Sequence, residues 1–381
     1  MQLRWLTSLQ QIPQAAWDAL FPGGYPFCRH AFLLTLEQGG SIDGRSGWQS
    51  QHLTVWQDEQ LIAAVPGYLK LHSYGEYLFD WQIAEAYQQM QLPYYPKWIA
   101  AIPFTPVTGP RLGFLPGMDR ASLLSAITGF LTAELETGKL HSLQWLYPEA
   151  DLTQALTEQG FWLRLDVQFL WHNRNYQDFT GYLQRLNSRK RKQILKERAA
   201  CADLQLVRLQ GSELTAAHWQ QVLQCYQATY IKRSGHSGYI TAQSFMQMAS
   251  QLADCIVVFA AFDPAKPQQM LAAALCFQGG NTLYGRYWGA LEPNDYLHFE
   301  LCYYQGIEYC IEQGLVFFDA GAQGEHKLKR GFAPVLRYGA YCFADTPLSA
   351  AIQGYFKQEQ QHLQHYLQAA EVALPYKTLL E

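Results

Sequence analysis

The chain has 381 residues, which is longer than a single compact core usually extends, so two domains are expected. Apolar residues make up 49% of the sequence and charged residues only 16%, a balance that buries a sizeable core and excludes extensive disorder. The formal net charge of -4 excludes a globally basic DNA-binding protein, although it leaves room for a local basic patch.

Neither a targeting segment nor a membrane span is expected. The N-terminal residues lack the apolar core of a signal peptide, and no stretch approaches the roughly 18 apolar residues of a spanning helix. The eight cysteines are scattered without C-x-x-C spacing, which favours reduced thiols over disulfides or a metal site. We therefore expect a cytoplasmic protein that binds no metal.

The first half of the chain predicts one α/β lobe. Apolar periodicity, Gly-rich helix ends and polar turns locate its elements. In chain order they are a strand at 3–7, helices at 17–21 and 27–38, an antiparallel meander at 51–56, 61–70 and 76–81, a helix at 124–135, a strand at 142–147, a helix ending at 160 and a strand ending at 171.

The second half repeats this order. Its elements are a strand at 204–209, helices at 219–230 and 245–252, an antiparallel meander at 255–262, 271–277 and 282–288, a helix at 297–313 and a strand at 316–319. By fold-level analogy this is the layout of a GNAT acyltransferase lobe. We predict an α/β (α+β mixed sheet) fold of tandem GNAT-like lobes at 1–175 and 202–346, joined by a basic helical connector at 176–201 and followed by a C-terminal helix at 347–381.

Five strings along the chain resemble the FemAB-like (peptidoglycan biosynthesis/recognition) branch of predicted N-acyltransferases. They are PFCRHAF at 26–32, HSYGEY at 72–77, PFTPVTGPR at 103–111, GRYWG at 285–289 and GAQGEHK at 321–327. The resemblance implies transfer of an acyl or aminoacyl group to an amine-bearing small molecule or peptide, such as a peptidoglycan-precursor peptide. The alternative is a non-catalytic protein that recognises a peptide or glycan-peptide on degenerate GNAT lobes.

No cofactor is firmly implied, and the donor is aminoacyl-tRNA or acyl-CoA. GNAT enzymes hold the coenzyme A pyrophosphate on a Gly-rich turn, where backbone N–H groups point at the anion. That turn is missing in both halves, and residues 289–295 carry acids where phosphate would need amides. The absence favours aminoacyl-tRNA, which is the donor that the resemblance implies.

Amide formation needs a base for the amine and a donor that stabilises the oxyanion. The densest set of suitable side chains lies just past the end of a predicted strand and comprises Asp319, Glu325, His326, Lys327, Lys329 and Arg330. Glu325 or Asp319 would act as the base, and Lys327 or His326 would face the developing negative charge. The alternative is a solvated turn in which Glu325 pairs with Lys329 at i, i+4.

Further polar and aromatic residues are candidates for substrate binding: Arg29, His30, Tyr74, Glu76, Asp80, Thr105, Thr108, Arg111, Arg286 and Trp288. Structural roles remain open for several of them, because histidine often caps an element and residues 105–111 also suit a plain turn. Trp288 would equally suit the core. Glu300 belongs to a polar stripe on its helix, and we expect it on a solvated face.

The predicted connector contains a run of basic residues with a single acid, Glu197. The basic residues are Arg185, Arg189, Lys190, Arg191, Lys192, Lys196 and Arg198. Four consecutive basic residues spread around a helix axis, so a polyanion could approach from several directions. This makes tRNA a candidate partner, and a solvated linker helix is the alternative.

We predict that changing Arg189, Lys190, Arg191 and Lys192 together to Gln weakens tRNA binding. The log–log dependence of affinity on salt should flatten by about 3 to 4 units, because roughly one unit is lost with each phosphate contact. Filter binding across a salt series measures this slope. Wild-type protein without salt-dependent tRNA affinity would contradict an aminoacyl-tRNA donor.

Overall fold

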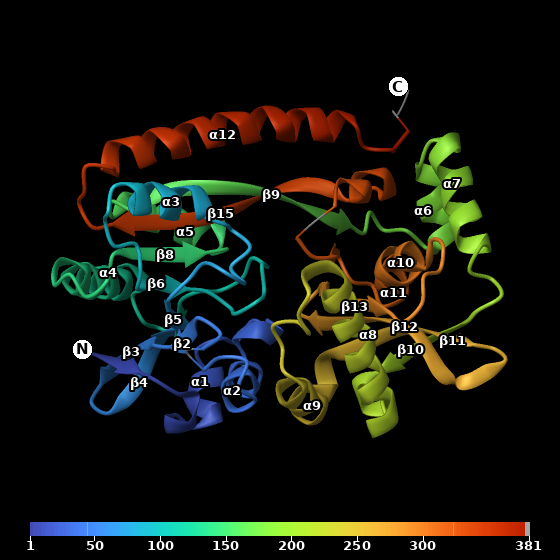
Figure 1. Ribbon diagram of the computed structural model, residues 1–381, viewed down its shortest axis with the longest axis horizontal. Coiled ribbons are helices and arrows are strands. Elements are labelled where there is room, and N and C mark those ends of the chain that lie inside the picture. The colour runs from blue at the N-terminus through green and yellow to red at the C-terminus, as the bar shows by residue number, and fades with distance from the viewer. Residues whose placement is uncertain (44, 323, 378–381) are drawn as a thin grey trace. The chain divides into compact units, whose positions relative to one another are not determined.

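A computed structural model describes residues 1–43, 45–322 and 324–377 of the protein (Figure 1). The chain divides into two compact units, and each unit is assembled from two separate segments. The first unit comprises Met1–Val167 and Leu336–Tyr366, and the second comprises Gln168–Val335 and Leu367–Glu381.

The strands of the first unit fall into two groups. One group is antiparallel and runs in the order β1 (Gln2–Leu6), β3 (His52–Gln57), β4 (Gln60–Val65) and β7 (Gly113–Phe114). The other runs in the order β15 (Ala333–Phe343), β8 (Ser142–Leu146), β6 (Lys97–Ala100), β5 (Gly67–Lys70) and β2 (Trp48–Ser50). Only β6 and β8 are parallel to each other among the described pairings of this group.

Helices α1 (Gln14–Asp18), α2 (His30–Gln38), α3 (Trp81–Gln89), α4 (Arg120–Glu136) and α5 (Ala150–Glu158) belong to the first unit, which also contains most of α12 (Ser349–Val372). Helix α4 begins where the Asp119 side chain accepts the backbone N–H of Ser122, a standard N-cap contact. Its leucines and isoleucine recur on one face. That face is buried, as the sequence periodicity predicts.

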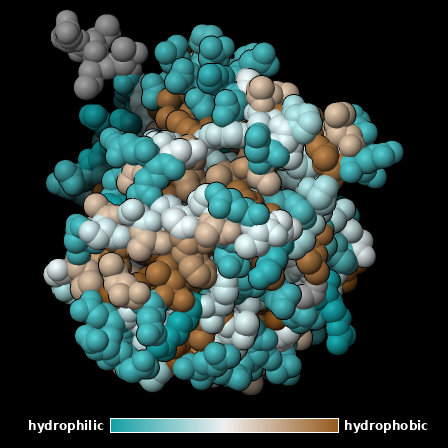
Figure 2. Space-filling model, turned by 90° about the vertical axis from the view of Figure 1, so that its left-hand side faces the viewer, coloured by the Kyte–Doolittle hydropathy of each residue, from teal (hydrophilic) through white to brown (hydrophobic). Residues whose placement is uncertain are grey.

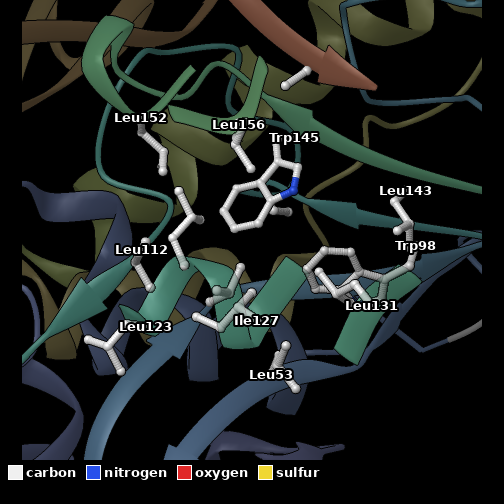
Figure 3. Close-up of a cluster of buried hydrophobic side chains, with 14 of the residues drawn as sticks. Leu53, Trp98, Leu112, Leu123, Ile127, Leu131, Leu143, Trp145, Leu152 and Leu156 are labelled. Carbon is white, nitrogen blue, oxygen red and sulfur yellow. The ribbon is translucent and has the colours of Figure 1, made fainter. Parts of the chain in front are cut away.

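The core of the first unit lies between α4 and both groups of strands (Figure 3). Ile127 and Leu131 of α4 are fully buried with Trp98 of β6 and Trp145 of β8. The rings of the two tryptophans meet edge to face, with centroids 6.2 Å apart. Leu53 of β3 joins the same cluster, so one hydrophobic core serves both groups of strands.

The second unit is built on a mainly antiparallel sheet. Its strands run in the order β10 (Gln205–Gln210), β11 (Ile256–Asp263), β12 (Lys266–Gly279), β13 (Thr282–Ala290), β14 (Phe317–Asp319) and β9 (Trp162–His172), of which residues 162–167 belong to the first unit. Strands β13 and β14 are parallel. The helices are α6 (Phe179–Arg185), α7 (Ser188–Ala199), α8 (Ala216–Ser234), α9 (Ala242–Gln251), α10 (Leu297–Phe299) and α11 (Gln305–Glu312).

Two irregularities in this unit interrupt regular elements. A π-helical segment, η5 (Glu300–Tyr304), separates α10 from α11 within the helix that the sequence predicts as continuous. Strand β13 is out of register with β12 around Arg286, because Tyr287 pairs with Leu275 and Gly285 with Cys276. Both π-bulges and β-bulges are common next to functional sites.

The α/β class with a mixed sheet is confirmed, and most predicted elements lie within a few residues of their observed bounds. One predicted strand is wrong: residues 76–80 form a loop that leads into α3. Polar and apolar side chains alternate in this segment, and the alternation suggested a strand. The buried side chains are the acids at 76 and 80, however, and the aromatic residues between them are partly exposed. Strands β2, β6, β7 and β15 were not predicted. The strand predicted at 61–70 is divided into β4 and β5, which pair in different groups, and the connector is two helices, α6 and α7.

Among the described residues, no helix combines the length and apolar composition that crossing a bilayer requires.

We predict that Gly289→Ala destabilises the second unit, whereas Gly129→Ala stabilises the first. A Cβ at Gly289 on β13 would overlap the backbone carbonyl of Cys225 in α8, so strand and helix would have to separate. Overpacking of this kind typically costs about 1–3 kcal/mol. Gly129 lies exposed in α4, and a methyl group there would meet open space, so alanine should gain about 0.5–1 kcal/mol. Urea denaturation of both variants measures the two changes, and equal stabilities would contradict the close contact.

Candidate active site

The candidate site lies in the second unit, where the chain leaves β14 and forms the short 3-10 helix η6 (Glu325–Arg330). Gly321 and Gly324 both have positive φ angles, 88° and 112°, which suit glycine. A side chain at Gly324 would overlap the imidazole ring of His326. The glycines therefore allow the loop to fold back closely on this ring.

His326 is paired with Tyr303 of the π-helical segment. His326 Nε2 and the Tyr303 hydroxyl share a hydrogen bond of 2.7 Å. The imidazole also contacts the rings of His298 and Phe299, with centroids 5.9 and 5.6 Å apart. Residues 298–303 and η6 thus bring two imidazoles and a phenol together beside one loop.

The other predicted catalytic residues lie around the same loop. The ammonium group of Lys327 is buried and donates a hydrogen bond to the Gly321 carbonyl. Asp319 is also buried, and its carboxylate accepts the backbone N–H of Gly321 at 3.2 Å. Glu325 is exposed to solvent. Lys327, His326 and Asp319 are thus inside the cluster, while Glu325 is at its surface.

Burial and neighbouring cations keep both imidazoles neutral. Burial lowers the pKa of His326, and the positive charges of Arg330, Lys327 and Lys329 lower it further. Burial is also the main cause that lowers the pKa of His298 to about 3, and its neighbours His326 and Arg233 add to the effect. Neutral imidazoles are thus expected at physiological pH, and a neutral imidazole can accept a proton.

Two of the residues predicted for substrate binding, Arg286 and Trp288, lie on β13 next to this cluster. Both side chains are partly exposed while Tyr287 between them is buried, as strand alternation predicts. The Trp288 ring meets the His298 ring edge to face at 5.2 Å. Trp288 thus lies at the edge of the site.

Glu300 is not on a solvated face, and that expectation was wrong. Its side chain is 1% exposed and pairs with Arg198 of α7 at 3.1 Å. The π-helical segment starts at Glu300 and alters the angular position of the residues that follow, so a regular helical stripe does not describe them.

In the first unit, Glu76 and Asp80 belong to a buried charge cluster. Lys97 Nζ donates to Asp80 at 2.5 Å and to Glu76 at 2.8 Å, and all three side chains are fully buried. Lys70 lies 3.9 Å from Glu76 and 4.1 Å from the centre of the Trp48 ring. Two lysines therefore balance two carboxylates inside the unit.

The cluster separates the pKa values of its two acids. Burial opposes the ionisation of Asp80, but the Lys97 charge and hydrogen bonds outweigh it and lower the pKa of Asp80 to about 2. Burial dominates at Glu76 and raises its pKa to about 7. Burial also lowers the pKa of Lys70 to about 7. Burial is thus the largest influence on the pKa of Glu76 and of Lys70, whereas the contacts with Lys97 decide the direction of the shift at Asp80.

Tyr74 lies on the surface of the loop that covers this cluster. The side chains of Leu71, Tyr74, Phe79 and Trp81 are between 39% and 56% exposed. The Tyr74 and Trp81 rings are 4.8 Å apart. Figure 2 shows apolar patches, in brown, among the hydrophilic surface of one face of the molecule.

The remaining first-unit candidates are held by the backbone. His30 Nε2 donates to the carbonyls of Leu9 and Ile12, at 2.9 and 3.1 Å. Arg111 is fully buried, and its guanidinium donates to the carbonyls of Val107, Pro110 and Leu146. These contacts give both side chains a structural role.

The other first-unit candidates for substrate binding lie next to His30 and Arg111 in the sequence. Arg29 is the residue before α2, Thr105 donates to the Pro103 carbonyl at 2.9 Å, and the Thr108 hydroxyl is buried without a hydrogen-bond partner in the described chain. The loop at 105–111 is thus packed, and most of its polar side-chain groups form hydrogen bonds with the backbone.

The predicted tRNA-binding residues lie on α7. Arg189 and Lys192 are exposed, and Lys190 and Arg191 are partly exposed. Asn187 caps the helix by accepting the backbone N–H of Lys190 at 3.0 Å. All four basic side chains therefore reach the surface of the helix.

Several residues of both clusters were missed by the sequence prediction. Tyr303, Arg233 and Lys97 carry no motif, and each lies far along the chain from its partners. Lys70 also carries no motif, although its partner Glu76 is close to it in the sequence. One usable signal was Lys70 at the end of the strand predicted at 61–70, because a charged residue that closes an apolar run requires a partner. Lys97 lies on β6, which was not predicted. In the described part of the chain, no group of three His, Cys, Asp or Glu side chains converges as a metal site would require.

The comparisons with known proteins place this chain among peptidoglycan-related proteins. A FemAB-like family model, described as peptidoglycan biosynthesis/recognition, matches residues 8–378. No curated protein sequence matches the chain.

Solved structures share the fold at low sequence identity. FemX is 13% identical, with a TM-score of 0.53 over 93% of this chain and 100% of that chain. The C-terminal domain of a protein named as a lysylphosphatidylglycerol synthetase, from Agrobacterium fabrum, is 12% identical, with a TM-score of 0.55 over 92% and 96%. L-PGS from Bacillus licheniformis is 11% identical, with a TM-score of 0.52 over 90% and 95%. Identities this low indicate a common fold and carry no residue roles.

We predict that Lys329→Gln raises the pKa of His326 toward its ordinary value. Lys329 is exposed and its positive charge disfavours the protonated imidazole, so removing the charge favours protonation. NMR titration of the histidine ring protons measures the change. Lys266→Gln removes the same charge from an exposed position on β12 and should leave the His326 midpoint unchanged. A midpoint that is the same in wild type and Lys329→Gln would contradict this electrostatic coupling.

Proposed function

Because the chain belongs to the FemAB-like family of peptidoglycan biosynthesis and recognition, we propose that it transfers an aminoacyl group to the amine of a peptidoglycan-precursor peptide. The proposal places the chemistry at η6 of the second unit. The observation that carries it is the Tyr303–His326 pair beside the buried ammonium of Lys327.

Aminoacyl transfer is a direct displacement that needs no covalent enzyme intermediate. The acceptor amine adds to the ester carbonyl of the donor, so that a C–N bond forms and the carbonyl oxygen becomes an oxyanion. The C–O bond then breaks as the C=O bond re-forms. The amine loses one proton and the leaving hydroxyl gains one, so the reaction balances with one base and one acid.

His326 suits the role of the base better than Glu325 does. Its ring is neutral and partly buried, and its hydrogen bond to the Tyr303 hydroxyl provides a route by which a proton can be passed. Glu325 is exposed at the surface of the cluster. Asp319 already accepts the Gly321 N–H and orders the loop.

Lys327 would stabilise the oxyanion. Its ammonium group is buried, where a positive charge acts more strongly on a developing negative charge than it would in water. The Gly321 carbonyl fixes the position of the ammonium, so little reorganisation is needed when negative charge develops.

The donor in this proposal is aminoacyl-tRNA, and the reaction takes place in the cytoplasm. The basic residues of α7 offer phosphate contacts. The segment after β13 supports this choice over acyl-CoA, because residues 291–296 are exposed and include Glu292 and Asp295, which would repel a pyrophosphate.

We predict that His326→Gln and Lys327→Met each lower transfer by roughly 10²-fold, as expected for loss of a base and of oxyanion stabilisation. Glu325→Gln is the matched control, since it removes a charge from the adjacent residue and should change the rate by less than about threefold. The assay supplies full-length protein with labelled aminoacyl-tRNA or acyl-CoA and a muropeptide precursor, and detects the product by mass spectrometry. Melting temperatures identify variants that fail to fold.

The outcomes separate the alternatives. A large loss in Glu325→Gln together with full activity in His326→Gln would make Glu325 the base. Muropeptide binding without transfer from either donor would overturn the enzymatic proposal in favour of a recognition protein.

A further inference from the structure

Helix α7 is rich in basic residues, but one of its faces is buried and carries an acid. Glu197, the single acid in the basic run, is 3% exposed and lies with Ile194 on the buried side of the helix. A carboxylate in that position needs a partner, because leaving an ionised acid unpaired away from water is strongly unfavourable.

The partner is Arg330, the last residue of η6. Arg330 donates to Glu197 Oε2 at 2.6 Å, and both side chains are no more than 4% exposed. The Tyr304 hydroxyl donates to the same carboxylate oxygen and accepts from Arg330 Nε at 2.8 Å. Gln193 donates to the other carboxylate oxygen at 2.8 Å. Both carboxylate oxygens of Glu197 therefore accept hydrogen bonds inside the second unit.

Arg330 in turn holds the backbone of the candidate base. Its second terminal nitrogen donates to the His326 carbonyl at 3.0 Å. Its guanidinium lies 3.7 Å from the centre of the Phe299 ring, which also contacts the His326 ring. One planar group thus connects α7, the π-helical region and the residue that carries the imidazole.

A second ion pair fastens the same end of α7. Arg198, the next residue, pairs with Glu300 at 3.1 Å and with Glu308 at 2.9 Å. The ion pairs of Arg198 thus join α7 to the start of the π-helical segment and to α11, and not to η6. They therefore provide a comparison in which a charge is removed beside α7 without touching Arg330.

We infer that Glu197 is a positioning residue: it holds the Arg330 guanidinium so that η6 keeps His326 against Tyr303. This inference rests on the proposed function, and it adds a role for a buried acid that lies outside η6. Without the carboxylate, the buried guanidinium loses its counter-charge and turns toward solvent or toward another acceptor. The His326 carbonyl and the Phe299 ring then lose their contact.

The test compares Glu197→Gln with Glu308→Gln in the full-length protein. Both remove one negative charge next to α7, but only Glu197 contacts Arg330. Glu197→Gln should shift the His326 titration midpoint measured by NMR and should accelerate hydrogen exchange at residues 324–331 at least tenfold. Transfer should fall about tenfold in kcat with KM within twofold, because misplacement of a catalytic group affects the chemical step. Glu308→Gln should leave all three measurements unchanged.

Rescue distinguishes positioning from general stability. Glu197→Asp keeps the charge and should recover most of the rate and the wild-type midpoint, and it carries the test if Glu197→Gln proves too unstable to titrate. A lowered melting temperature with an unchanged His326 midpoint and unchanged exchange in η6 would overturn the inference. If wild-type protein shows no transfer, the midpoint and exchange measurements still decide whether Glu197 sets η6, so failure of the proposed function is separate from failure of this inference.

Discussion

Burying ionised side chains is the constraint on which both units depend. Few residues of this chain are charged, yet Lys70, Lys97 and Arg111 of the first unit and Lys327 and Arg330 of the second are all nearly inaccessible to solvent. A buried charge is tolerated only when a counter-charge or several hydrogen-bond acceptors meet it with good geometry. Each of these cations has such a partner, and the partner fixes a loop or a helix in place.

The two units use the same constraint in different ways. In the first, two lysines and two carboxylates form a closed set inside the unit, beneath a loop whose exposed residues are largely aromatic. In the second, the cations are held mostly by single carboxylates or backbone carbonyls, so an excess of positive charge surrounds His298 and His326. The paired charges of the first unit hold its loop in place without leaving a net charge. The excess of cations in the second unit creates a positive electrostatic potential that favours a developing anion.

Sequence patterns predicted the parts of the fold that local periodicity determines. The stripe of Leu124, Ile127, Leu131 and Leu135 located α4, and the long apolar runs of β11 to β13 located the second meander. The same reasoning failed at residues 76–80, because alternation cannot tell which set of side chains is buried when charges are paired inside. It also failed at Glu300, where a π-turn changes the angular positions along the helix.

The candidate site was predictable only as a loop. The small residues around Gly321 and Gly324 and the charged residues after them are adjacent in sequence, so their clustering is visible without a structure. The partners are not: Tyr303 lies 23 residues from His326, and Glu197 lies 133 residues from Arg330. In the sequence Glu197 is only the single acid within a basic run, because composition does not reveal which face of a helix packs against the rest of the unit.

The assembly of each unit from two chain segments sets an order for synthesis. Strand β8 pairs with β15 through Leu146 to Gly339 and Ser142 to Phe343, and both belong to the first unit. A ribosome makes the chain from its N-terminus, so the edge of β8 emerges long before its partner strand exists. An unpaired edge of this kind is a template for wrong pairing, and the nascent first unit must keep it covered while the whole Gln168–Val335 segment is made. The unit that starts to form first is therefore completed only after most of the other has been synthesised.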